Sequence, residues 1–293
     1  MWRTGYRLLL WLAFPFVLAR LWWRGRAEPE YRRNIGERFG FYATTPGRPV
    51  IWLHAVSMGE TRAAEPLLQA LKSRHPDCDL LVTQMTATGR EAAQRLLGGS
   101  VRVAWLAYDY PSAVRRFLRH FRPRLGILME TEIWFHLVEE CKRSGVPLLL
   151  ANARMSARSA RGYGLVAPLA RAALEDLSAV AAQTAEDAER LRSLGARAVE
   201  VTGNLKFDAE PSAGSESLAA QFRLRFGSRP VLLAASTREG EEALLLDALE
   251  DNVLGDALLV IVPRHPQRFD DVSQLLEARG LKFARRSAGT RLE

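Results

Sequence analysis

Residues 50–73 read VIWLHAVSMGETRAAEPLLQALKS, a short apolar run followed by a helical pattern. The run at 50–56 is almost entirely apolar, which predicts a strand whose two faces are both buried. A helix is predicted over 60–73, after a turn that contains Ser57 and Gly59. A strand of this kind followed by a helix is typical of a parallel sheet that helices cover on both faces, so the expected fold class is α/β.

The same alternation continues along the chain in both directions from this stretch. Further strands are predicted at 79–85, 101–107, 124–130, 146–152, 177–183, 198–204, 230–236, 257–263 and 282–286. Further helices are predicted at 90–97, 111–120, 133–144, 164–175, 185–194, 216–226, 240–250 and 270–279. A closed α/β barrel would need eight strands in one ring, and about ten strands with a break between them argue against it.

The break is the stretch DAEPSAGSES at 208–217, which is rich in turn residues and has no apolar period. We therefore expect a first Rossmann-like domain at 27–207, a linker and helix at 208–229, and a second domain at 230–293. Three strands and two helices make half of a nucleotide-binding unit, so the second domain is expected to be incomplete.

The composition restricts the classes of partner. The chain has 293 residues, 41 Lys and Arg against 33 Asp and Glu, and a formal net charge of +8. Such a basic balance favours an anionic partner, namely nucleic acid, phospholipid or a phosphorylated substrate. Basic residues are not interleaved with aromatic ones in a nucleic-acid motif, so nucleic acid is not expected. The two cysteines, Cys78 and Cys141, exclude a disulfide framework and indicate a reducing compartment.

Residues 1–26 carry an uncharged core, LLLWLAFPFVLA at 8–19, with Trp and Arg on both flanks. This pattern predicts a membrane anchor that either spans a bilayer or lies in its interface. A cleaved signal peptide and a buried core helix are the alternatives. The heavier basic flank follows the segment, at Arg20, Arg24 and Arg26, which places the body of the protein on the cytoplasmic side.

Candidate site residues follow the strands, because ligands of open α/β sheets bind at the carboxyl ends of the strands. Ser57-x-x-Glu60 has the form of a capping box, and from the pattern alone capping explains Glu60 more simply than catalysis does. Glu130 ends an apolar strand beside Glu132, where a carboxylate is costly unless an Arg pairs with it or it has a function. Lys206 either faces the site or is solvated surface.

The second domain offers a cationic strand end. Arg264 and His265 stand between Pro263 and Pro266, which makes a rigid segment that is either an anion site or a plain loop. The histidines show no ligand spacing, so no metal site is expected. No Ser-His-Asp or Cys-His arrangement can be proposed from the sequence.

Nine stretches, taken together and in this order, resemble one family, the 3-deoxy-D-manno-octulosonic acid (Kdo) transferases of lipopolysaccharide assembly. They are RLWWRGR (20–26), YRRNIGERFGFY (31–42), HAVSMGET (54–61), TQMTATG (83–89), METEIW (129–134), ANARMSARSARGY (151–163), TGNLKFD (202–208), STREGEE (236–242) and VPRHPQRF (262–269). The resemblance spans nearly the whole chain. It implies a GT-B-like fold with two Rossmann-like domains, held at the cytoplasmic side of the cell inner membrane.

The resemblance also implies an activity and its residues. The family transfers Kdo from CMP-Kdo to the lipid A precursor, the tetraacyldisaccharide 4'-phosphate lipid IVA, with inversion at the anomeric carbon. Its catalytic base corresponds to Glu60, its transition-state groups to Glu130 and Lys206, and a CMP contact to Pro263 and Arg264. No cofactor is implied besides the donor substrate.

Two features depart from the family pattern. Phe135 stands where the family usually has proline after the METEIW-type motif, which indicates a local change in a loop. Family members also continue well beyond the length of this chain, so the second domain is expected to be truncated and the chain to turn over little CMP-Kdo. Another GT-B enzyme with a different nucleotide sugar, and a non-catalytic lipid-phosphate-binding module tethered to a membrane, are the alternative functions.

Overall fold

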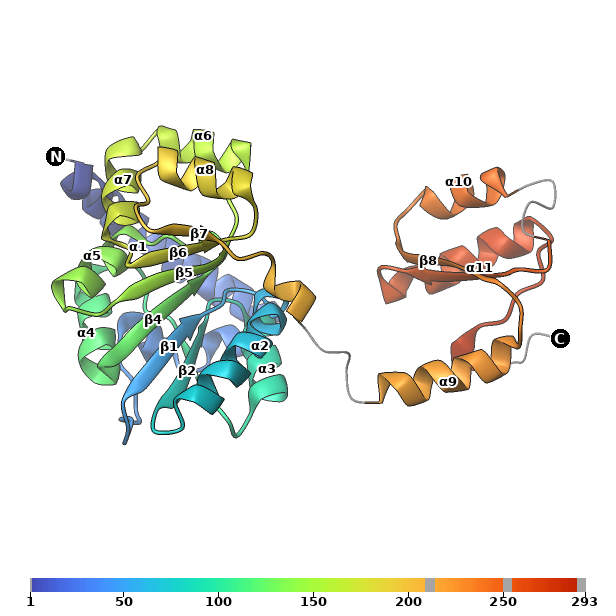
Figure 1. Cartoon of the computed structure of the whole chain (residues 1–293), viewed down its shortest axis with the longest axis horizontal. Coiled ribbons are helices and arrows are strands. Elements are labelled where there is room, and N and C mark those ends of the chain that lie inside the picture. The colour runs from blue at the N-terminus through green and yellow to red at the C-terminus, as the bar shows by residue number, and fades with distance from the viewer. Residues whose placement is uncertain (1, 209–213, 250–254, 289–293) are drawn as a thin grey trace. The chain divides into compact units, whose positions relative to one another are not determined.

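The computed structural model describes residues 2–208, 214–249 and 255–288. Its backbone contacts divide the chain into two units, Met1–Glu210 and Pro211–Glu293. Each unit has its own parallel sheet, and each is described by itself below (Figure 1).

The first unit is built on a seven-stranded sheet in the order β3-β2-β1-β4-β5-β6-β7, in which every neighbouring pair is parallel. The strands are β1 (Val50–His54), β2 (Asp79–Gln84), β3 (Arg102–Trp105), β4 (Pro123–Met129), β5 (Leu148–Ala153), β6 (Ala179–Ala182) and β7 (Val199–Val201). The parallel sheet expected from the apolar runs is therefore confirmed. The chain reverses its direction of travel across the sheet between β1 and β4, which is where such folds bind ligands.

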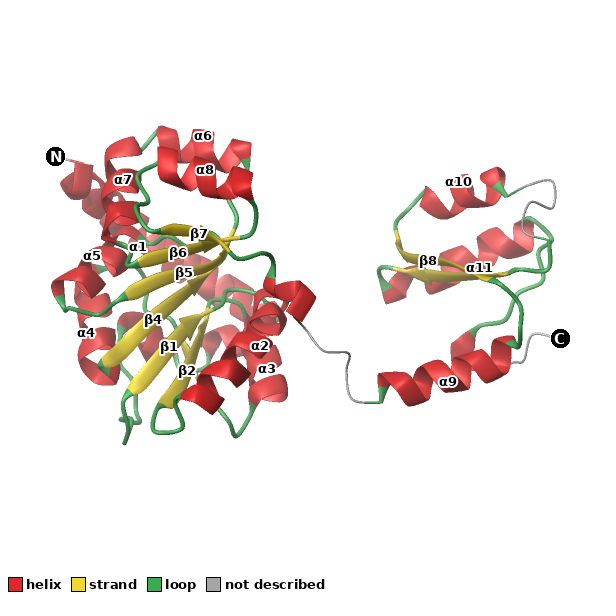
Figure 2. Cartoon of the chain, viewed as in Figure 1, coloured by secondary structure: helices red, strands yellow, loops and turns green. Residues whose placement is uncertain are grey.

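Helices cover both faces of this sheet (Figure 2). They are α1 (Trp2–Ala27), α2 (Met58–Arg74), α3 (Ala87–Leu97), α4 (Pro111–Phe121), α5 (Phe135–Arg143), α6 (Ala157–Gly164), α7 (Ala167–Asp176) and α8 (Ala185–Ser193), with 3-10 turns η1 (Pro29–Arg32), η2 (Ile35–Phe39) and η3 (Leu205–Asp208). Successive residues of β1 enter different cores, because side chains alternate across a strand. Val50 and Trp52 join the core under α4, α5 and α7, whereas Ile51 and Leu53 join the core under α2 and α3.

One helix was not expected. The sequence predicts a single helix at 164–175, but the structure has α7 there and α6 before it. Helix α6 has no buried residue, and only Ala160 and Tyr163 pack against the core, which gives too few apolar positions to mark a helix in the sequence. It is fixed instead by its cap, because the Ser156 hydroxyl accepts the Ser159 N–H at 3.1 Å.

The second unit pairs β8 (Val231–Thr237) with β9 (Leu258–Pro263). Around them lie α9 (Ser215–Phe226), α10 (Glu241–Ala248), α11 (Phe269–Ala278), η4 (Pro266–Arg268) and η5 (Arg286–Ala288). The strand predicted at 282–286 is wrong, since residues 281–285 have no regular structure. Only Phe283 and Ala284 are apolar in KFARR, and Arg285 forms an ion pair with Asp270 at 2.6 Å.

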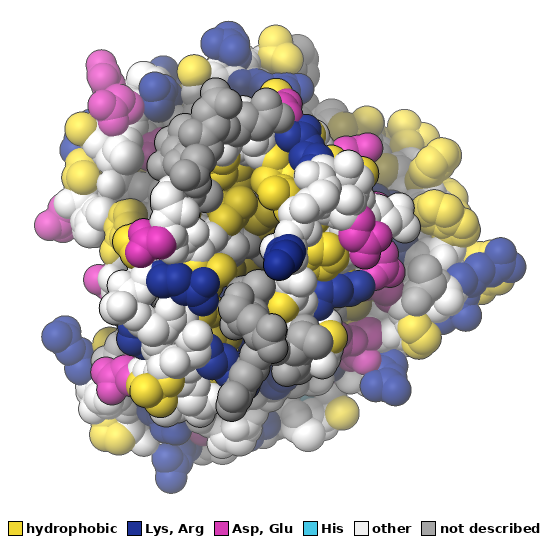
Figure 3. Space-filling view, turned by 90° about the vertical axis from the view of Figure 1, so that its right-hand side faces the viewer, with side chains coloured by type: hydrophobic (Ala, Val, Ile, Leu, Met, Phe, Trp, Pro, Cys, Tyr) yellow, Lys and Arg dark blue, Asp and Glu magenta, His cyan; other side chains and the backbone are white. Residues whose placement is uncertain are grey.

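The sheet of the second unit is more open than that of the first. Leu232 and Leu233 point to opposite faces of β8, and both are exposed, by 38% and 58%. Hydrophobic side chains are visible on the face of this unit in Figure 3. Among the described residues, β8 therefore lacks the two-sided cover that an apolar parallel strand has in the first sheet.

Candidate functional site

Glu60 forms a variant of the capping box that its spacing predicts, in which its carboxylate accepts the backbone N–H of Val56 and not that of Ser57. Ser57 begins α2, and its hydroxyl oxygen accepts the Glu60 N–H at 3.2 Å. The Glu60 carboxylate accepts the Val56 N–H at 2.8 Å on one oxygen and the Ser57 hydroxyl at 3.0 Å on the other. Each carboxylate oxygen has a second lone pair, so a capping Glu60 can still accept a proton from a bound molecule.

The surroundings of Glu60 make it a stronger base than an ordinary glutamate. Partial burial raises the pKa of its carboxyl, the hydrogen bonds from Val56 and Ser57 lower it, the charge of Glu130 raises it and that of Lys206 lowers it, with a net rise. Glu130 and Lys206 therefore lie within electrostatic reach of Glu60. The structure brings together the three side chains that the sequence singled out in the first unit.

Glu130 stands at the carboxyl end of β4 in a left-handed backbone conformation, with φ = 58°. Its N–H donates to the Ala151 carbonyl at 2.9 Å, which ties the turn to β5. No arginine forms an ion pair with Glu130 in the part of the chain that the structure describes, so the alternative of a structural Arg partner is not seen there. A non-glycine residue in this conformation costs roughly 1–3 kcal/mol, and such strain gathers at functional sites.

Glu132 is a site residue to which the sequence analysis gave no role. It is half-buried, and the Trp134 indole N–H donates to its carboxylate at 3.0 Å. Burial raises the pKa of the Glu132 carboxyl, the charge of Glu60 raises it further, the bond from Trp134 lowers it, and Glu130 adds a smaller rise. Three carboxyl groups thus share this end of the sheet. Its position midway between Glu130 and Trp134, two residues from each, was the available signal.

Lys206 lies in η3, which packs against α2. The Asn204 side-chain oxygen accepts the Lys206 N–H at 3.0 Å, and Leu205 packs on the core that contains Ile51. The Lys206 side chain is exposed, as expected for a solvated lysine, but its charge also acts on Glu60. The basic helix α6 adjoins the loop that carries Glu130 and Glu132, because the Tyr163 hydroxyl of α6 donates to the Thr131 carbonyl at 3.3 Å.

Pro263 and Arg264 belong to the second unit. Pro263 ends β9, and the exposed Arg264 donates its N–H to the Thr237 carbonyl at 2.9 Å. Nearby, Arg268 forms a bidentate ion pair with the buried Glu242 at 2.8 and 2.9 Å. This pair joins the STREGEE and VPRHPQRF stretches, and it fixes the strand end that carries Arg264.

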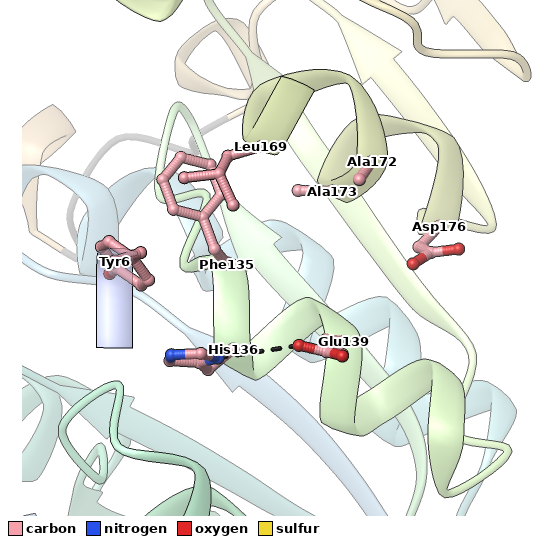
Figure 4. A pocket seen from close by; sticks show the side chains of 8 residues that line it. All are labelled: Tyr6, Phe135, His136, Glu139, Leu169, Ala172, Ala173 and Asp176. Carbon is pink, nitrogen blue, oxygen red and sulfur yellow. Dashed lines mark ion pairs between the residues drawn. The ribbon is translucent and has the colours of Figure 1, made fainter. Parts of the chain in front are cut away.

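A separate cavity lies between α1, α5 and α7 and is lined by Tyr6, Phe135, His136 and Glu139, among others (Figure 4). The His136 ring nitrogen Nδ1 and the Glu139 carboxylate are 3.7 Å apart. The cavity measures about 10 Å³, which is room for one water molecule and far too little for a sugar nucleotide. Among the described residues, no group of three or more His, Cys, Asp and Glu side chains is arranged to hold a metal ion.

Comparison with known proteins gives consistent results. Residues 33–209 match the family described as 3-deoxy-D-manno-octulosonic-acid transferase (kdotransferase). The 3-deoxy-D-manno-octulosonic acid transferase of Bordetella pertussis is 43% identical over 310 residues, which cover 98% of this chain and 70% of that protein. The protein of the same description from Haemophilus influenzae is 36% identical, with coverages of 98% and 69%.

Solved structures extend the comparison to the fold. UDP-GlcNAc 2-epimerase from Neisseria meningitidis, bound to UDP-GlcNAc, aligns with a TM-score of 0.58 at 16% identity, over 78% of this chain and 69% of that one. A glycosyltransferase from Rickettsia africae aligns with a TM-score of 0.53 at 12% identity, over 80% and 66%. The GT-B-like α/β fold class is thereby confirmed. The chain belongs to the 3-deoxy-D-manno-octulosonic acid transferase family, and it is a glycosyltransferase.

Proposed function

We propose that the reaction of this chain is the transfer of Kdo from CMP-Kdo to the phosphorylated, acylated glucosamine disaccharide that is the precursor of lipid A, in lipopolysaccharide synthesis, at the low turnover expected above. The observation that carries this proposal is the convergence of Glu60, Glu130, Glu132 and Lys206 at the carboxyl ends of the first sheet. The donor substrate supplies the transferred group, and no further cofactor is required by the reaction.

Glu60 serves as the general base in this proposal. The acceptor hydroxyl loses its proton to the Glu60 carboxylate as its oxygen attacks the anomeric carbon of Kdo. The bond from that carbon to the CMP phosphate oxygen breaks, and CMP departs with the electron pair. One displacement from the opposite side inverts the anomeric carbon. The hydrogen bonds from Val56 and Ser57 orient the carboxylate, and a well-placed base contributes about 10²–10⁴-fold to the rate.

The other charged groups act on the charges that develop during transfer. The Glu130 carboxylate stabilises positive charge at the anomeric centre, and the Lys206 ammonium stabilises the departing phosphate. In the second unit, Pro263 and Arg264 contact CMP. The acceptor phosphates are bound by the exposed arginines Arg154, Arg158 and Arg161, since α6 adjoins the loop that carries Glu130 and Glu132.

Helix α1 holds the protein at the cytoplasmic face of the inner membrane, lying in the membrane interface. By length and composition Thr4–Arg26 could cross a bilayer, and only 11% of its apolar 18-residue window is buried in the protein, unlike a core helix. One side of α1 is attached to the body: the Tyr6 hydroxyl donates to Asp109, and the Tyr110 hydroxyl donates to the Leu10 carbonyl, both at 2.8 Å. These contacts favour a retained helix over a cleaved signal peptide.

The opposite side of α1 is apolar and open. Leu8, Leu12 and Phe16 recur every four residues and are exposed by 60%, 79% and 82%. Such a helix can lie in the plane of the membrane interface, with its apolar stripe buried between the lipid headgroups and the acyl chains and its other side packed on the folded domain. This placement brings a lipid acceptor to the unit that carries Glu60.

The test is transfer by the purified chain with CMP-Kdo and lipid IVA, with product identified by mass spectrometry and nucleotide binding measured by calorimetry. Kdo transfer, with binding of CMP in preference to UDP, supports the proposal. Turnover of a UDP-sugar in place of CMP-Kdo would identify a different nucleotide-sugar transferase. Binding of lipid phosphates without turnover of CMP-Kdo would favour a non-catalytic binding module.

A further inference from the structure

The carboxyl end of β5 contains an irregularity in its pairing with β6. Leu150 pairs with Val180 on β6, but Ala153 pairs with Ala182, so the register shifts between them. Asn152 lies inside this bulge in a left-handed conformation, with φ = 52° and a side chain that is almost fully buried. Bulges beside active sites serve to re-aim a side chain, and asparagine tolerates this conformation better than most residues.

The re-aimed side chain holds the segment that carries Lys206. The Asn152 side-chain oxygen accepts the Leu205 N–H at 3.1 Å, which fixes the first residue of η3. Fifty-three residues separate the two partners in the sequence, so this is a tertiary contact and not a local turn. Because the Lys206 side chain is exposed, its direction depends on the backbone of η3 and therefore on this contact.

The neighbouring residue holds the other charged group. The Ala151 carbonyl accepts the Glu130 N–H at 2.9 Å. The Asn152 carbonyl in turn accepts the Gln183 side-chain N–H at 3.0 Å, a bond separate from the one to Leu205. Two consecutive residues of β5 thus contact the backbone on which Glu130 stands and the backbone next to Lys206.

The choice of asparagine also has a chemical reason. Its side-chain NH₂ is buried without a hydrogen-bond partner among the described residues, which costs about 1–3 kcal/mol. An aspartate would offer the same acceptor without that unpaired NH₂, but it would bury a negative charge beside Glu130. Asparagine is the residue that accepts from Leu205, adopts φ near 50° and stays neutral.

We infer that Asn152 is a positioning residue, whose bulged, left-handed conformation aims its side-chain oxygen at Leu205 and so keeps η3, and with it Lys206, against α2, the helix that carries Glu60. It touches neither substrate nor reacting atoms. Its effect on turnover rests on the proposed function, whereas the positioning itself can be measured without turnover.

Two substitutions separate the conformation from the hydrogen bond. Asn152→Gly keeps the left-handed backbone and removes the acceptor, whereas Asn152→Asp keeps the acceptor. We expect amide hydrogen exchange at Leu205, followed by NMR, to become at least about tenfold faster in Asn152→Gly and to change less in Asn152→Asp. Gln183→Ala is the matched control, because it removes a different bond to Asn152 and should leave Leu205 protected.

Activity provides the second measurement. In Asn152→Gly, kcat for Kdo transfer should fall about tenfold or more with little change in KM for CMP-Kdo. The acid limb of its pH profile should move to higher pH, since the charge of Lys206 is one of the factors that lower the pKa of Glu60, against the larger rise from burial. Partial recovery of kcat in Asn152→Asp would support the acceptor role.

The outcomes distinguish the two proposals. Unchanged exchange at Leu205 in a folded Asn152→Gly overturns the positioning role, whatever the activity. Lost protection with unchanged kcat also overturns it as a factor in turnover, while the proposed function stands. If the wild-type chain transfers no Kdo, the proposed function fails, but exchange still decides the contact. Should Asn152→Gly not fold, Leu205→Pro removes the donor instead, and exchange of the Phe207 N–H, which donates to the Asn204 carbonyl, reports on η3.

Discussion

Glu60→Gln separates the two roles that one glutamate combines. The variant keeps the length of the side chain and one carbonyl oxygen, so it can retain either the bond from Val56 or the bond from Ser57. The other donor then faces the new NH₂ group. Losing one such bond costs about 0.5–1.5 kcal/mol of stability, and water reduces this cost because it reaches the partly exposed side chain. The fold should persist with a small drop in melting temperature.

The effect on Kdo transfer should be much larger. An amide cannot take the proton of the acceptor hydroxyl, so we expect kcat to fall on the order of 10²-fold or more, which corresponds to about 2.7 kcal/mol in the barrier. Ser57→Ala is the matched control, because it removes the cap and leaves the carboxylate. It should cost about 0.5–2 kcal/mol of stability and reduce transfer far less.

Thermal unfolding and initial rates of Kdo transfer are measured on the wild type and both variants. A large loss of rate with nearly unchanged melting in Glu60→Gln, against the opposite pattern in Ser57→Ala, supports the base. Retained transfer by a folded Glu60→Gln would refute the reasoning and leave Glu60 as a cap. Glu130 or Glu132 would then be the next residue to test.

Three further predictions concern the fold and its surface. Burial raises the pKa of Asp109 to about 7, against the hydrogen bonds that lower it, so the folded chain keeps a proton that the unfolded chain releases near pH 4. The contribution of Asp109 to the free energy of unfolding therefore falls as the pH rises from about 4 to about 7. Asp109→Asn should abolish that part of the decline, and parallel stability curves of both proteins over this pH range would contradict it. Replacing Leu12 and Phe16 together by Glu should abolish co-sedimentation with anionic phospholipid vesicles. The control Tyr6→Phe loses one hydrogen bond on the attached side of α1 and should still bind. Equal binding of the wild type, the double variant and the control would exclude the interfacial helix. Gly126→Ala should lower the unfolding free energy by about 1–3 kcal/mol in denaturant titrations, because its Cβ would lie 2.6 Å from Leu148 and 2.8 Å from Trp52, and an unchanged midpoint would show that this core relaxes more easily than expected.

The sheet of the first unit could be predicted because its strands are buried on both faces and appear as apolar runs. The rule did not find α6, which has no buried residue, and KFARR was predicted as a strand although it contains only two apolar residues. The long apolar helix α1 was recognisable from its composition. That it lies along the body depends on Tyr6 meeting Asp109, two residues that are distant in sequence.

The candidate site shows the same division. Glu60 was accessible to sequence reasoning because a capping box is a local pattern, and its capping contacts are confirmed. Asn152 was not, because its importance depends on a register shift and on a partner fifty-three residues away. Glu132 lies in the METEIW stretch at 129–134, but only the three-dimensional fold brings its charge close to Glu60.

The strand order of the first sheet has a consequence for biosynthesis. Strand β1 pairs with β2 on one edge and with β4 on the other, and β4 ends at Met129, 75 residues after His54. At about 5–20 residues per second, a ribosome needs roughly 4–15 s to make that stretch. During this time the apolar β1 presents an unpaired edge to other nascent chains. Among the neighbouring strands of this sheet, β1 and β4 lie farthest apart in the sequence, so this edge stays unpaired longest during synthesis.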